Sequence, residues 1–341
     1  MITNRFVVKI LKIFLPLLLG GMILYWMYRD FDFCRIGDVM RNEMDWTWML
    51  LSLPFGFTAQ VFRGMRWSQL LEPIGEQSRR SVRIHAVLLS YASSLVIPRV
   101  GEFARCGILK TYDAVSFSKA LGTVVTERAV DFALMMTMVV ITIFSQLPIF
   151  ADFFSRTGTR VDAVFGMFSF TGWLVTAICG VAALILLYYL FKYVSVYRKV
   201  KYMFRGLWQG VMSLRKIRNL PLFILFTLGI WGSYFLHYYL TFFCFDFTAE
   251  LGWACALVTF VVGSTAVVVP TPNGAGSWHF AVKTMLILYG VADERALYFV
   301  LIVHSLQTLL VVALGVYAWV ALSFQKKREK NLSTTNNIYY E

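Results

Sequence analysis

Apolar residues in this chain gather into long runs, which short charged segments separate. A helix needs about twenty mostly apolar residues to cross a bilayer. Six runs reach that length, at about 9–28, 46–65, 129–148, 171–191, 221–245 and 297–322. The pattern therefore predicts six full transmembrane helices. The first is not a cleavable signal, because Tyr28 and Arg29 stand where a cleavage site would need small residues.

Two further apolar regions, at about 84–125 and 251–292, contain proline and glycine near their middle. Proline lacks the amide proton that a regular helix needs, and glycine permits turns. Irregular backbone at membrane depth is tolerated only where protein or a water-filled cavity surrounds it. We therefore predict that each region is a broken re-entrant hairpin rather than a simple span.

Positive charge concentrates in segments that flank some of the runs. The segment 192–219 carries eight cations and no acid, and both termini are basic, so the positive-inside rule makes all three cytoplasmic. The acid-rich loop 29–45 is then outside. With these assignments the hairpin 84–125 starts and ends in the cytoplasm, whereas the hairpin 251–292 starts and ends outside.

The two halves of the chain have the same order of helix, helix, hairpin, helix, with opposite orientation. Residues 1–148 form the first inverted repeat, residues 149–324 form the second, and residues 325–341 form a disordered cytoplasmic tail. Secondary transporters with inverted repeats bind substrate near mid-membrane, and interrupted segments in matching positions point to that site. The expected fold is an all-α polytopic membrane protein with six full transmembrane helices and two re-entrant hairpins in an inverted-topology repeat.

Composition excludes several other classes. Of the 341 residues, 58% are hydrophobic and 15% are charged, and the mean hydropathy is +0.65, which is far from a soluble domain. The net charge of +13 comes from cations between apolar runs, which set orientation, so nucleic acid is not an expected partner. The five cysteines and four histidines show no metal-ligand or disulfide spacing, and no nucleotide-binding motif occurs, so we expect neither a metal nor a cofactor.

Six of the charged residues within or just after the first hairpin are candidates for a functional role, because each charge at bilayer depth costs about 2.5 to 3.5 kcal/mol. They are Arg99, Glu102, Arg105, Glu127, Arg128 and Asp131. Glu102 and Arg105 stand three apart, as do Arg128 and Asp131, so each pair can share a helix face. Two interpretations stay open. The six charges neutralise one another, or one or more arginines keep donors for a phosphate.

Two more arginines, Arg63 and Arg66, lie at the cytoplasmic end of the second predicted helix. Such side chains commonly extend to the lipid headgroups. They can also collect an anionic headgroup at the mouth of the hairpin.

The second hairpin contains VVVPTPNGAGSWHF, with two prolines and two glycines. Asn273, Gly274 and Gly276 are expected to leave backbone amides free before a half-helix, an arrangement that favours anions. His279 and Lys283 stand four apart on one helix face, and Lys283 is the only formal charge in the hairpin. We therefore add Asn273, Gly274, His279 and Lys283 to the candidate substrate-binding residues.

Four stretches carry a resemblance to a known family: RGMRWSQLLEP, IPRVGEFARCGILK, FSKALGTVVTERAVDFALM and VPTPNGAGSWHFAV. Over about residues 10–320 the chain resembles the membrane region of lysylphosphatidylglycerol synthases and related stand-alone flippase-like proteins. The resemblance implies a fold that moves aminoacylated, other anionic or polyprenyl-linked lipids between leaflets. Family members often carry a glutamate after the second tip, where this chain has Gly276-Ser277-Trp278-His279, so the substrate stays open. No room for an aminoacyl-transferase domain remains before Glu341, and we expect no enzyme of that kind.

These observations favour a flippase or scramblase in the cytoplasmic (inner) membrane, without a nucleotide site of its own. Arg99, Arg105 and Arg128 from one hairpin, with Lys283 and the amides near Gly274 from the other, would hold an anionic lipid headgroup. Glu102, Glu127, Asp131 or His279 would then be available as a proton carrier.

Two other functions stay open. The first is a lipid-headgroup transferase or phosphatase that uses His279 with Ser277, or Glu102. The second is an accessory or scaffold protein of an envelope lipid or glycan pathway. The expected partners are membrane lipids with anionic headgroups, while a homo-oligomer and a separate lipid-modifying enzyme are left open.

Overall fold

The computed structural model describes residues 18, 20–29, 31–145, 212–269 and 271–325. Within these ranges all regular structure is helical, and no strand occurs. Residues 20–28, at the end of the first predicted transmembrane run, are helical. The predicted helix at 171–191, most of the one at 9–28 and the tail after 325 lie outside the described residues.

Four long helices make up the first half of the described chain. They are α3 (Trp46–Leu71), α4 (Arg80–Val96), α5 (Val100–Asp113) and α6 (Phe117–Ser145). Helix α3 begins where the Asp45 carboxylate accepts a hydrogen bond from the Thr47 amide at 2.8 Å, and it ends just before Pro73. It is therefore longer than the predicted run of 46–65.

The first hairpin is shorter than the sequence suggested. Its arms are α4 and α5, which pack against each other, and the chain turns at Ala114, whose φ is 56°. Residues from Phe117 onward belong to α6, one continuous helix. Glu127 and Arg128 do not interrupt α6, because both are ion-paired with neighbouring helices. The predicted boundary at 125, and the predicted start of the next helix at 129, are therefore wrong.

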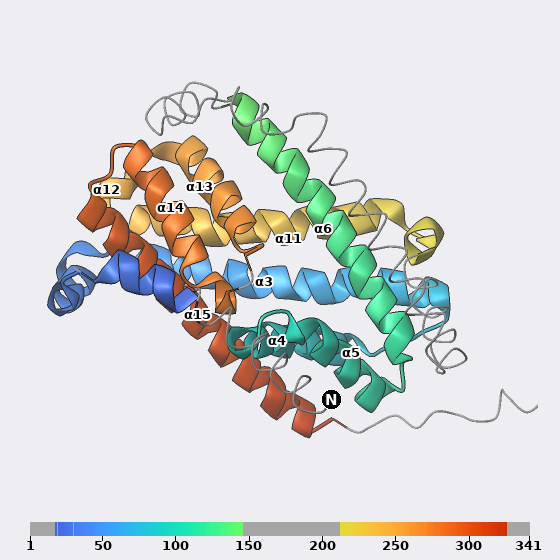
Figure 1. Ribbon diagram of the computed structural model, residues 1–341. Helices are drawn as coiled ribbons and strands as arrows, with labels where there is room; N and C mark the ends of the chain where they lie inside the picture. The colour runs from blue at the N-terminus through green and yellow to red at the C-terminus, as the bar shows by residue number, and fades with distance from the viewer. Residues whose placement is uncertain (1–17, 19, 30, 146–211, 270, 326–341) are drawn as a thin grey trace, which may run out of the picture.

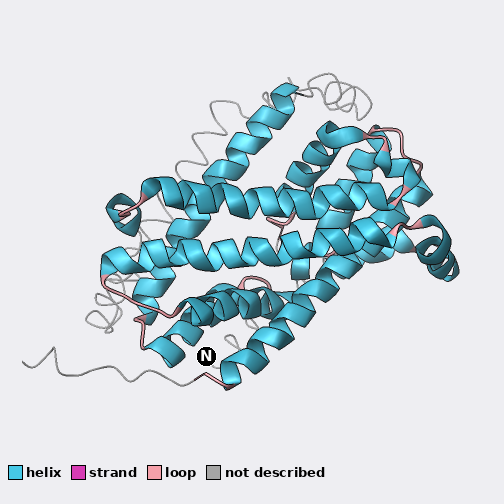
Figure 2. Ribbon diagram, turned by 180° about the vertical axis from the view of Figure 1, so that it is seen from behind, coloured by secondary structure: helices cyan, strands magenta, loops and turns pink. Residues whose placement is uncertain are grey.

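The described part of the second half contains a further hairpin between two long helices. Its helices are α11 (Leu220–Tyr239), the short α12 (Asp246–Ala249), α13 (Gly252–Ala266), α14 (Ser277–Leu288) and α15 (Asp293–Ser323). Helices α13 and α14 pack together as the arms of the second hairpin. Helices α3 and α11 lie side by side along the molecule, and α15 packs against both α4 and α14 (Figures 1 and 2).

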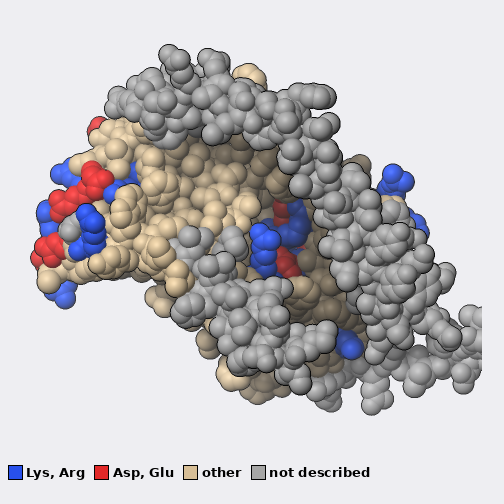
Figure 3. Space-filling model, in the orientation of Figure 1, with Lys and Arg blue, Asp and Glu red and all other residues tan. Residues whose placement is uncertain are grey.

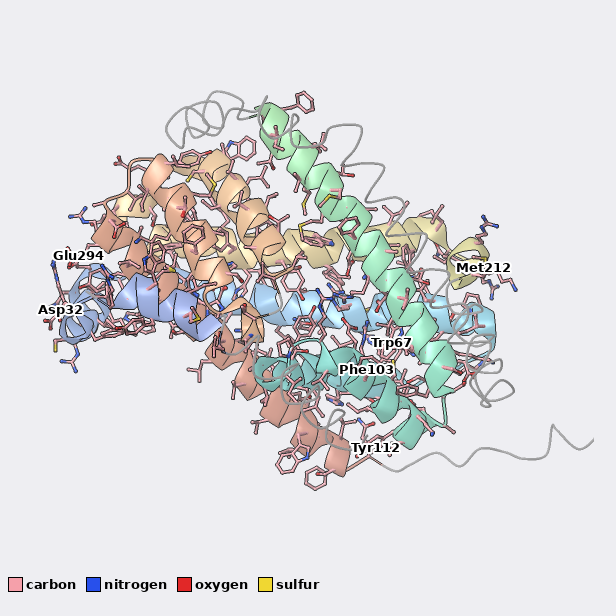
Figure 4. All side chains as sticks on the ribbon, in the orientation of Figure 1. Asp32, Trp67, Phe103, Tyr112, Met212 and Glu294 are labelled. Carbon is pink, nitrogen blue, oxygen red and sulfur yellow. The ribbon has the colours of Figure 1, made fainter. Side chains whose placement is uncertain are left out.

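Loops predicted to lie outside gather at one end of the molecule. The guanidinium of Arg35 lies 3.2 Å from the Glu294 carboxylate, and the Asp45 amide donates to the Cys244 carbonyl at 2.8 Å. Figure 4 shows Asp32 and Glu294 close together there, with Met212 at the opposite end. The arms of the second hairpin therefore begin and end at this end of the molecule.

Loops predicted to lie inside gather at the opposite end. The Arg79 guanidinium lies 2.6 Å from the Asp113 carboxylate, which ties the start of α4 to the end of α5. Lys119 and Glu76 pair at 2.9 Å beside them. The first hairpin therefore begins and ends here, so the two hairpins enter the helical bundle from opposite ends.

Three helical segments of the described residues are long and apolar enough to cross a membrane: Phe117–Ser145, Leu220–Cys244 and Asp293–Ser323. They correspond to three of the six predicted spans, and the chain is a membrane-embedded helical protein. Helix α3 has the required length but is not among them. Its polar residues, Gln60, Arg63 and Arg66 among them, lower its mean hydropathy.

Candidate functional site

A cavity of about 400 Å³ lies where the tips of the two hairpins meet. Pro98 and Arg99 reach it from the first tip, and Thr271 and Asn273 reach it from the second. Arg99 Nη2 donates to the Val268 carbonyl at 3.3 Å, so the two tips touch directly. Helices α3, α4, α11 and α15 complete the walls.

The first tip is a sharp turn centred on Arg99. Helix α4 ends at Val96, Ile97 is extended, and Pro98 cannot donate the hydrogen bond that would continue the helix. Arg99 then adopts a left-handed conformation with φ 63°, which costs a residue other than glycine about 1–2 kcal/mol. Non-glycine residues held in this way cluster at functional sites.

The Arg99 side chain is exposed on the cavity wall. No carboxylate among the described residues forms an ion pair with it, and the Val268 carbonyl occupies only one of its five donors. Arg99 therefore keeps hydrogen-bond donors for a ligand such as a phosphate, which is one of the two interpretations left open by the sequence.

The second tip is a 3-10 turn, Pro272–Gly274, in which Asn273 has φ 53° and Gly274 has φ 72°. Asn273 Nδ2 donates to Thr308 Oγ1 of α15 at 2.6 Å, and the Asn273 carbonyl lies 3.1 Å from His304 Nε2. These contacts anchor the tip to α15. Both Asn273 and Gly274 line the cavity, as predicted for substrate-binding positions.

Two of the three backbone amides expected to be free at this tip, those of Gly274 and Gly276, are hydrogen-bonded. The Gly274 amide donates to the Thr271 carbonyl at 3.2 Å, and the Gly276 amide donates to His279 Nδ1 at 3.4 Å. The Thr271 carbonyl of the turn and the His279 side chain therefore accept the hydrogen bonds of these two amides. The amides of Gly274 and Gly276 therefore offer no ready anion site.

A network of charged residues forms the side of the cavity next to α5 and α6. We call it the ion-pair network, and its members are Arg63, Arg66, Glu102, Arg105, Glu127, Arg128 and Asp131. Figure 3 shows basic and acidic groups side by side near the middle of this face, separate from the charged groups at its left end. Four arginines face three carboxylates, which leaves an excess of one positive charge.

Asp131 and Glu127 of α6 hold the network together. Asp131 accepts a hydrogen bond from Arg63 at 2.7 Å and is ion-paired with Arg66 at 2.8 Å, both on α3. Glu127 lies 2.7 Å from Arg105 of α5 and 3.6 Å from Arg66. Helices α3, α5 and α6 are thereby joined through two carboxylates.

The pairs predicted from spacing are confirmed. Arg105 and Glu102 are 2.8 Å apart, and Arg128 and Asp131 are 3.6 Å apart, each pair three residues apart on one helix. Arg128 also lies 3.3 Å from Glu102, which links α6 to α5. Mutual neutralisation thus accounts for most of the charges in and near the first hairpin.

Three arginines of the network are almost wholly buried: the exposed side-chain fractions of Arg63, Arg66 and Arg105 are 3%, 0% and 1%. Arg105 lies over the ring of Trp67 at 4.8 Å. Arg63 and Arg66 therefore do not extend to the lipid surface, and they are not free to collect a headgroup. Arg105 is likewise not free to bind a headgroup, because it is ion-paired with Glu102 of the same helix and with Glu127 of α6.

Of the network, only Glu102 and Arg128 line the cavity, with 28% and 43% of their side chains exposed. Together with Arg99 they are the charged groups on its wall. Two cations and one shared carboxylate leave this wall positive.

The structure places the predicted Lys283 site elsewhere. Lys283 Nζ lies 2.9 Å from the Asp293 carboxylate, near the end of the molecule that carries Glu294, and Lys283 does not line the cavity. Helix α14 runs away from the tip, so Lys283, six residues into it, is directed toward the next loop.

His279 lies behind the cavity wall rather than on it. It is 3% exposed, and its ring centroid is 4.4 Å from that of His304, which does line the cavity. Ser277 Oγ donates to the Gly274 carbonyl at 3.2 Å. No hydrogen bond joins Ser277 to His279 in the part of the chain that the structure describes.

Several cavity residues escaped the sequence analysis. Gln60 Nε2 donates to Tyr234 Oη at 3.0 Å, and Tyr234 Oη donates to Tyr91 Oη at 2.9 Å, which links α3, α11 and α4. On α15, His304 and Thr308 stand four apart in an apolar helix. These two polar residues on one face of an apolar helix could have been predicted from the sequence to face a cavity. The two tyrosines could not have been selected in this way, because the chain contains 17 tyrosines.

No group of three or more histidine, cysteine or acidic residues that could hold a metal ion occurs among the described residues. None of the curated proteins and none of the solved structures matches this chain. The family model of the lysylphosphatidylglycerol synthase TM region does match, over residues 13–315. Since that match spans most of the sequence, the chain belongs to the lysylphosphatidylglycerol synthase transmembrane-region family.

Proposed function

We propose that this protein moves a lipid with an anionic headgroup between the leaflets of the cytoplasmic membrane, as a flippase or scramblase. One observation carries the proposal. Two hairpins that enter the bundle from opposite ends touch at their tips and border a cavity with Arg99 and Arg128 on its wall. Family membership supports the same class of protein.

The proposed ligand is the phosphate of a lipid headgroup. A guanidinium matches phosphate geometry with two parallel hydrogen bonds, and Arg99 has donors to spare. A cavity of about 400 Å³ suits a headgroup, whereas acyl or polyprenyl chains would stay in the surrounding lipid. Gln60, Asn273 and the tyrosine pair offer hydrogen bonds to the polar remainder of such a headgroup, which includes an aminoacylated one.

The proposed movement follows from the pseudo-symmetric arrangement of the hairpins. In proteins with inverted repeats, one repeat rocks against the other around a fixed site, which opens that site to each side in turn. The hydrogen bond from Arg99 to the Val268 carbonyl joins the tips, and a headgroup phosphate that takes over the Arg99 donors would release it. We place both termini in the cytoplasm, on the basis of the basic segments described above.

Purified protein in liposomes with fluorescent phosphatidylglycerol tests the proposal. An external quencher measures how much lipid leaves the protected leaflet. Arg99→Ala is expected to slow this movement about tenfold, since about 1.4 kcal/mol corresponds to a factor of ten. Lys283→Ala is the matched control, because it also removes one cation from a hairpin but does not touch the cavity.

Equal movement in wild type, Arg99→Ala and protein-free liposomes would contradict transport by this route. Release of the headgroup without movement of the lipid would favour a transferase or phosphatase instead.

A further inference from the structure

A second, larger cavity of about 740 Å³ lies apart from the central one. It is formed by the end of α3, the start of α4, the 3-10 turn Ser213–Lys216 and the start of α11. This is the end of the molecule at which Met212 is labelled in Figure 4. Its walls share no residue with the central cavity.

Cations dominate this second cavity. Four line it, Arg80, Arg83, Lys216 and Arg218, against the single acid Glu72. None of the four forms an ion pair with a carboxylate among the described residues. A charged loop usually presents such residues to solvent, but here they converge from separate stretches of the chain on one concave surface.

One of the cations is held in place. Arg83 Nε donates to the Gly64 carbonyl at 3.3 Å, and its Nη1 donates to the Ser78 carbonyl. These contacts to neutral carbonyls orient the guanidinium without cancelling its charge. A fixed guanidinium with no carboxylate within ion-pair distance is suited to a phosphate site.

The wall of the cavity also carries an amide with no partner. Both the Oε1 and the Nε2 of Gln69 are buried, and neither forms a hydrogen bond in the described structure. Buried amide groups are almost always hydrogen-bonded, so a bare one needs an explanation. A rotation of the Gln69 side chain toward the cavity would let its amide donate to a ligand there and supply the missing bond.

The start of α11 adds a further favourable field. Asn219 caps this helix, with Oδ1 accepting from the Leu222 amide at 3.1 Å, and both residues line the cavity. The positive end of the helix dipole therefore faces the same space as the cations. Met65, Leu222 and Phe226 form an apolar side of the cavity.

We propose that this second cavity, the basic cavity, binds a phosphate monoester, with the phosphate among Arg80, Arg83, Lys216 and Arg218 and near Gln69. An excess of three positive charges suits a doubly charged phosphate better than a neutral or zwitterionic group. The apolar side fits the glycerol and first methylenes of a lipid, although a soluble phosphate carries the same recognition chemistry. The site does not depend on the transport proposal, since it shares no residue with the central cavity.

Binding of fluorescent short-chain phosphatidic acid to the purified full chain in detergent tests this proposal by anisotropy. Arg218→Gln and Lys216→Gln are each expected to weaken binding about tenfold, as expected for one lost charge-assisted hydrogen bond. Arg215→Gln is the matched control, because Arg215 lies on the same exposed turn, carries the same charge and does not line the cavity. It is expected to change binding less than about twofold, since an exposed charge outside the cavity contributes only weakly through screened electrostatics.

Gln69→Glu separates a specific site from general surface charge. It lowers the net charge by one, as Arg215→Gln does, yet it places a carboxylate at the cavity wall and is expected to weaken binding about tenfold or more. Equal effects of Gln69→Glu and Arg215→Gln, or binding that does not saturate, would overturn the proposal.

Two further arms identify the source of the phosphate and the site. Displacement by millimolar inorganic phosphate would support a soluble ligand, whereas displacement by unlabelled phosphatidic acid alone would support a lipid. Arg99→Ala in the central cavity is expected to leave unchanged the component of binding that Arg218→Gln weakens. If Arg99→Ala abolishes binding while Arg218→Gln does not, the phosphate binds in the central cavity and the basic cavity is not its site.

Discussion

The two hairpins share a layout but are held together in different ways. In the first, the arms touch backbone to backbone, and Arg105 of α5 pairs with Glu102 of the same helix and with Glu127 of α6, which fixes α5 against α6. In the second, α13 and α14 carry no buried ion pair within the described chain. They meet through apolar and aromatic contacts, such as those of Trp278 with Gly263 of α13 and with Tyr238 of α11.

This difference shows that a charged residue at membrane depth can have either a structural role or a ligand-binding role. The buried Arg105 of the first hairpin and the buried Arg63 and Arg66 of α3 are matched by carboxylates, so they hold the helices in one arrangement. The arginine at the tip is exposed and has no carboxylate partner in the described chain, so it is available to a ligand. The comparison therefore points to the tips as the place of binding and to the arms of the first hairpin as the support.

The strongest test of this division is Arg105→Ala. It leaves Glu127, which is fully buried, with Arg66 at 3.6 Å as its remaining partner. Removal of one partner of a buried ion pair costs about 3–5 kcal/mol, so we expect a loss of that size in the free energy of unfolding in mixed micelles. Lys110→Ala, on the exposed face of the same helix, is the control. Equal stability of the two variants would show that the network does not hold the first hairpin.

The backbone contact of the first hairpin predicts the next largest effect. A Cβ on Gly101 would lie 1.9 Å from the Ser90 carbonyl oxygen, whereas one on Gly263 would lie 2.9 Å from side-chain atoms of Trp278 and Val282. Side chains can shift, but the helix backbone cannot shift without opening the hairpin. We expect Gly101→Ala to cost about 3 kcal/mol and Gly263→Ala about 1 kcal/mol in thermal unfolding experiments. A larger cost for Gly263→Ala than for Gly101→Ala would contradict the proposed difference between the two hairpins.

Arg99→Gly tests whether the tip binds and the arms support. Glycine adopts φ 63° without strain, so the variant is expected to be as stable as wild type, or more stable by about 1 kcal/mol. The movement of phosphatidylglycerol in liposomes is expected to fall about tenfold, because the free guanidinium is lost. A parallel fall in melting temperature and movement would instead assign Arg99 a structural role.

Lys283→Ala is expected to have the smallest effect. Its partner Asp293 is 64% exposed, and pairs open to solvent contribute about 0–1 kcal/mol. We expect nearly unchanged unfolding and unchanged lipid movement in the same liposome assay. A large loss of lipid movement would show that Lys283 takes part in binding, and would contradict the proposal that the tips bind while the arms support them.

Local chemistry explains the features that sequence reasoning predicted well. The break at Pro98 follows from the missing amide proton, and the pairs of Glu102 with Arg105 and of Arg128 with Asp131 follow from a spacing of three residues. The grouping of basic and acidic loops at opposite ends agrees with their charges. Each of these needs only neighbouring residues or the charge of a loop.

Features that depend on distant residues could not be predicted. Arg63 and Arg66 pair with Asp131 more than sixty positions later, so their burial depends on how α3 packs against α6. Lys283 was assigned to the cavity because its helix begins there, although it pairs with Asp293 beyond that helix. The continuity of α6 was likewise missed, because its charges are neutralised by partners that the sequence does not place beside it.

By itself the sequence determined that the chain is a helical membrane protein, where two apolar segments break, and which loops share a charge. These depend on hydropathy, on proline and glycine, and on charge counts, all of which are local. Only the tertiary structure decided which arginine stays free, because that depends on which carboxylates lie within about 4 Å across helix interfaces. The side-chain packing of α3, α5 and α6 set those distances and left Arg99 without a carboxylate partner in the described chain.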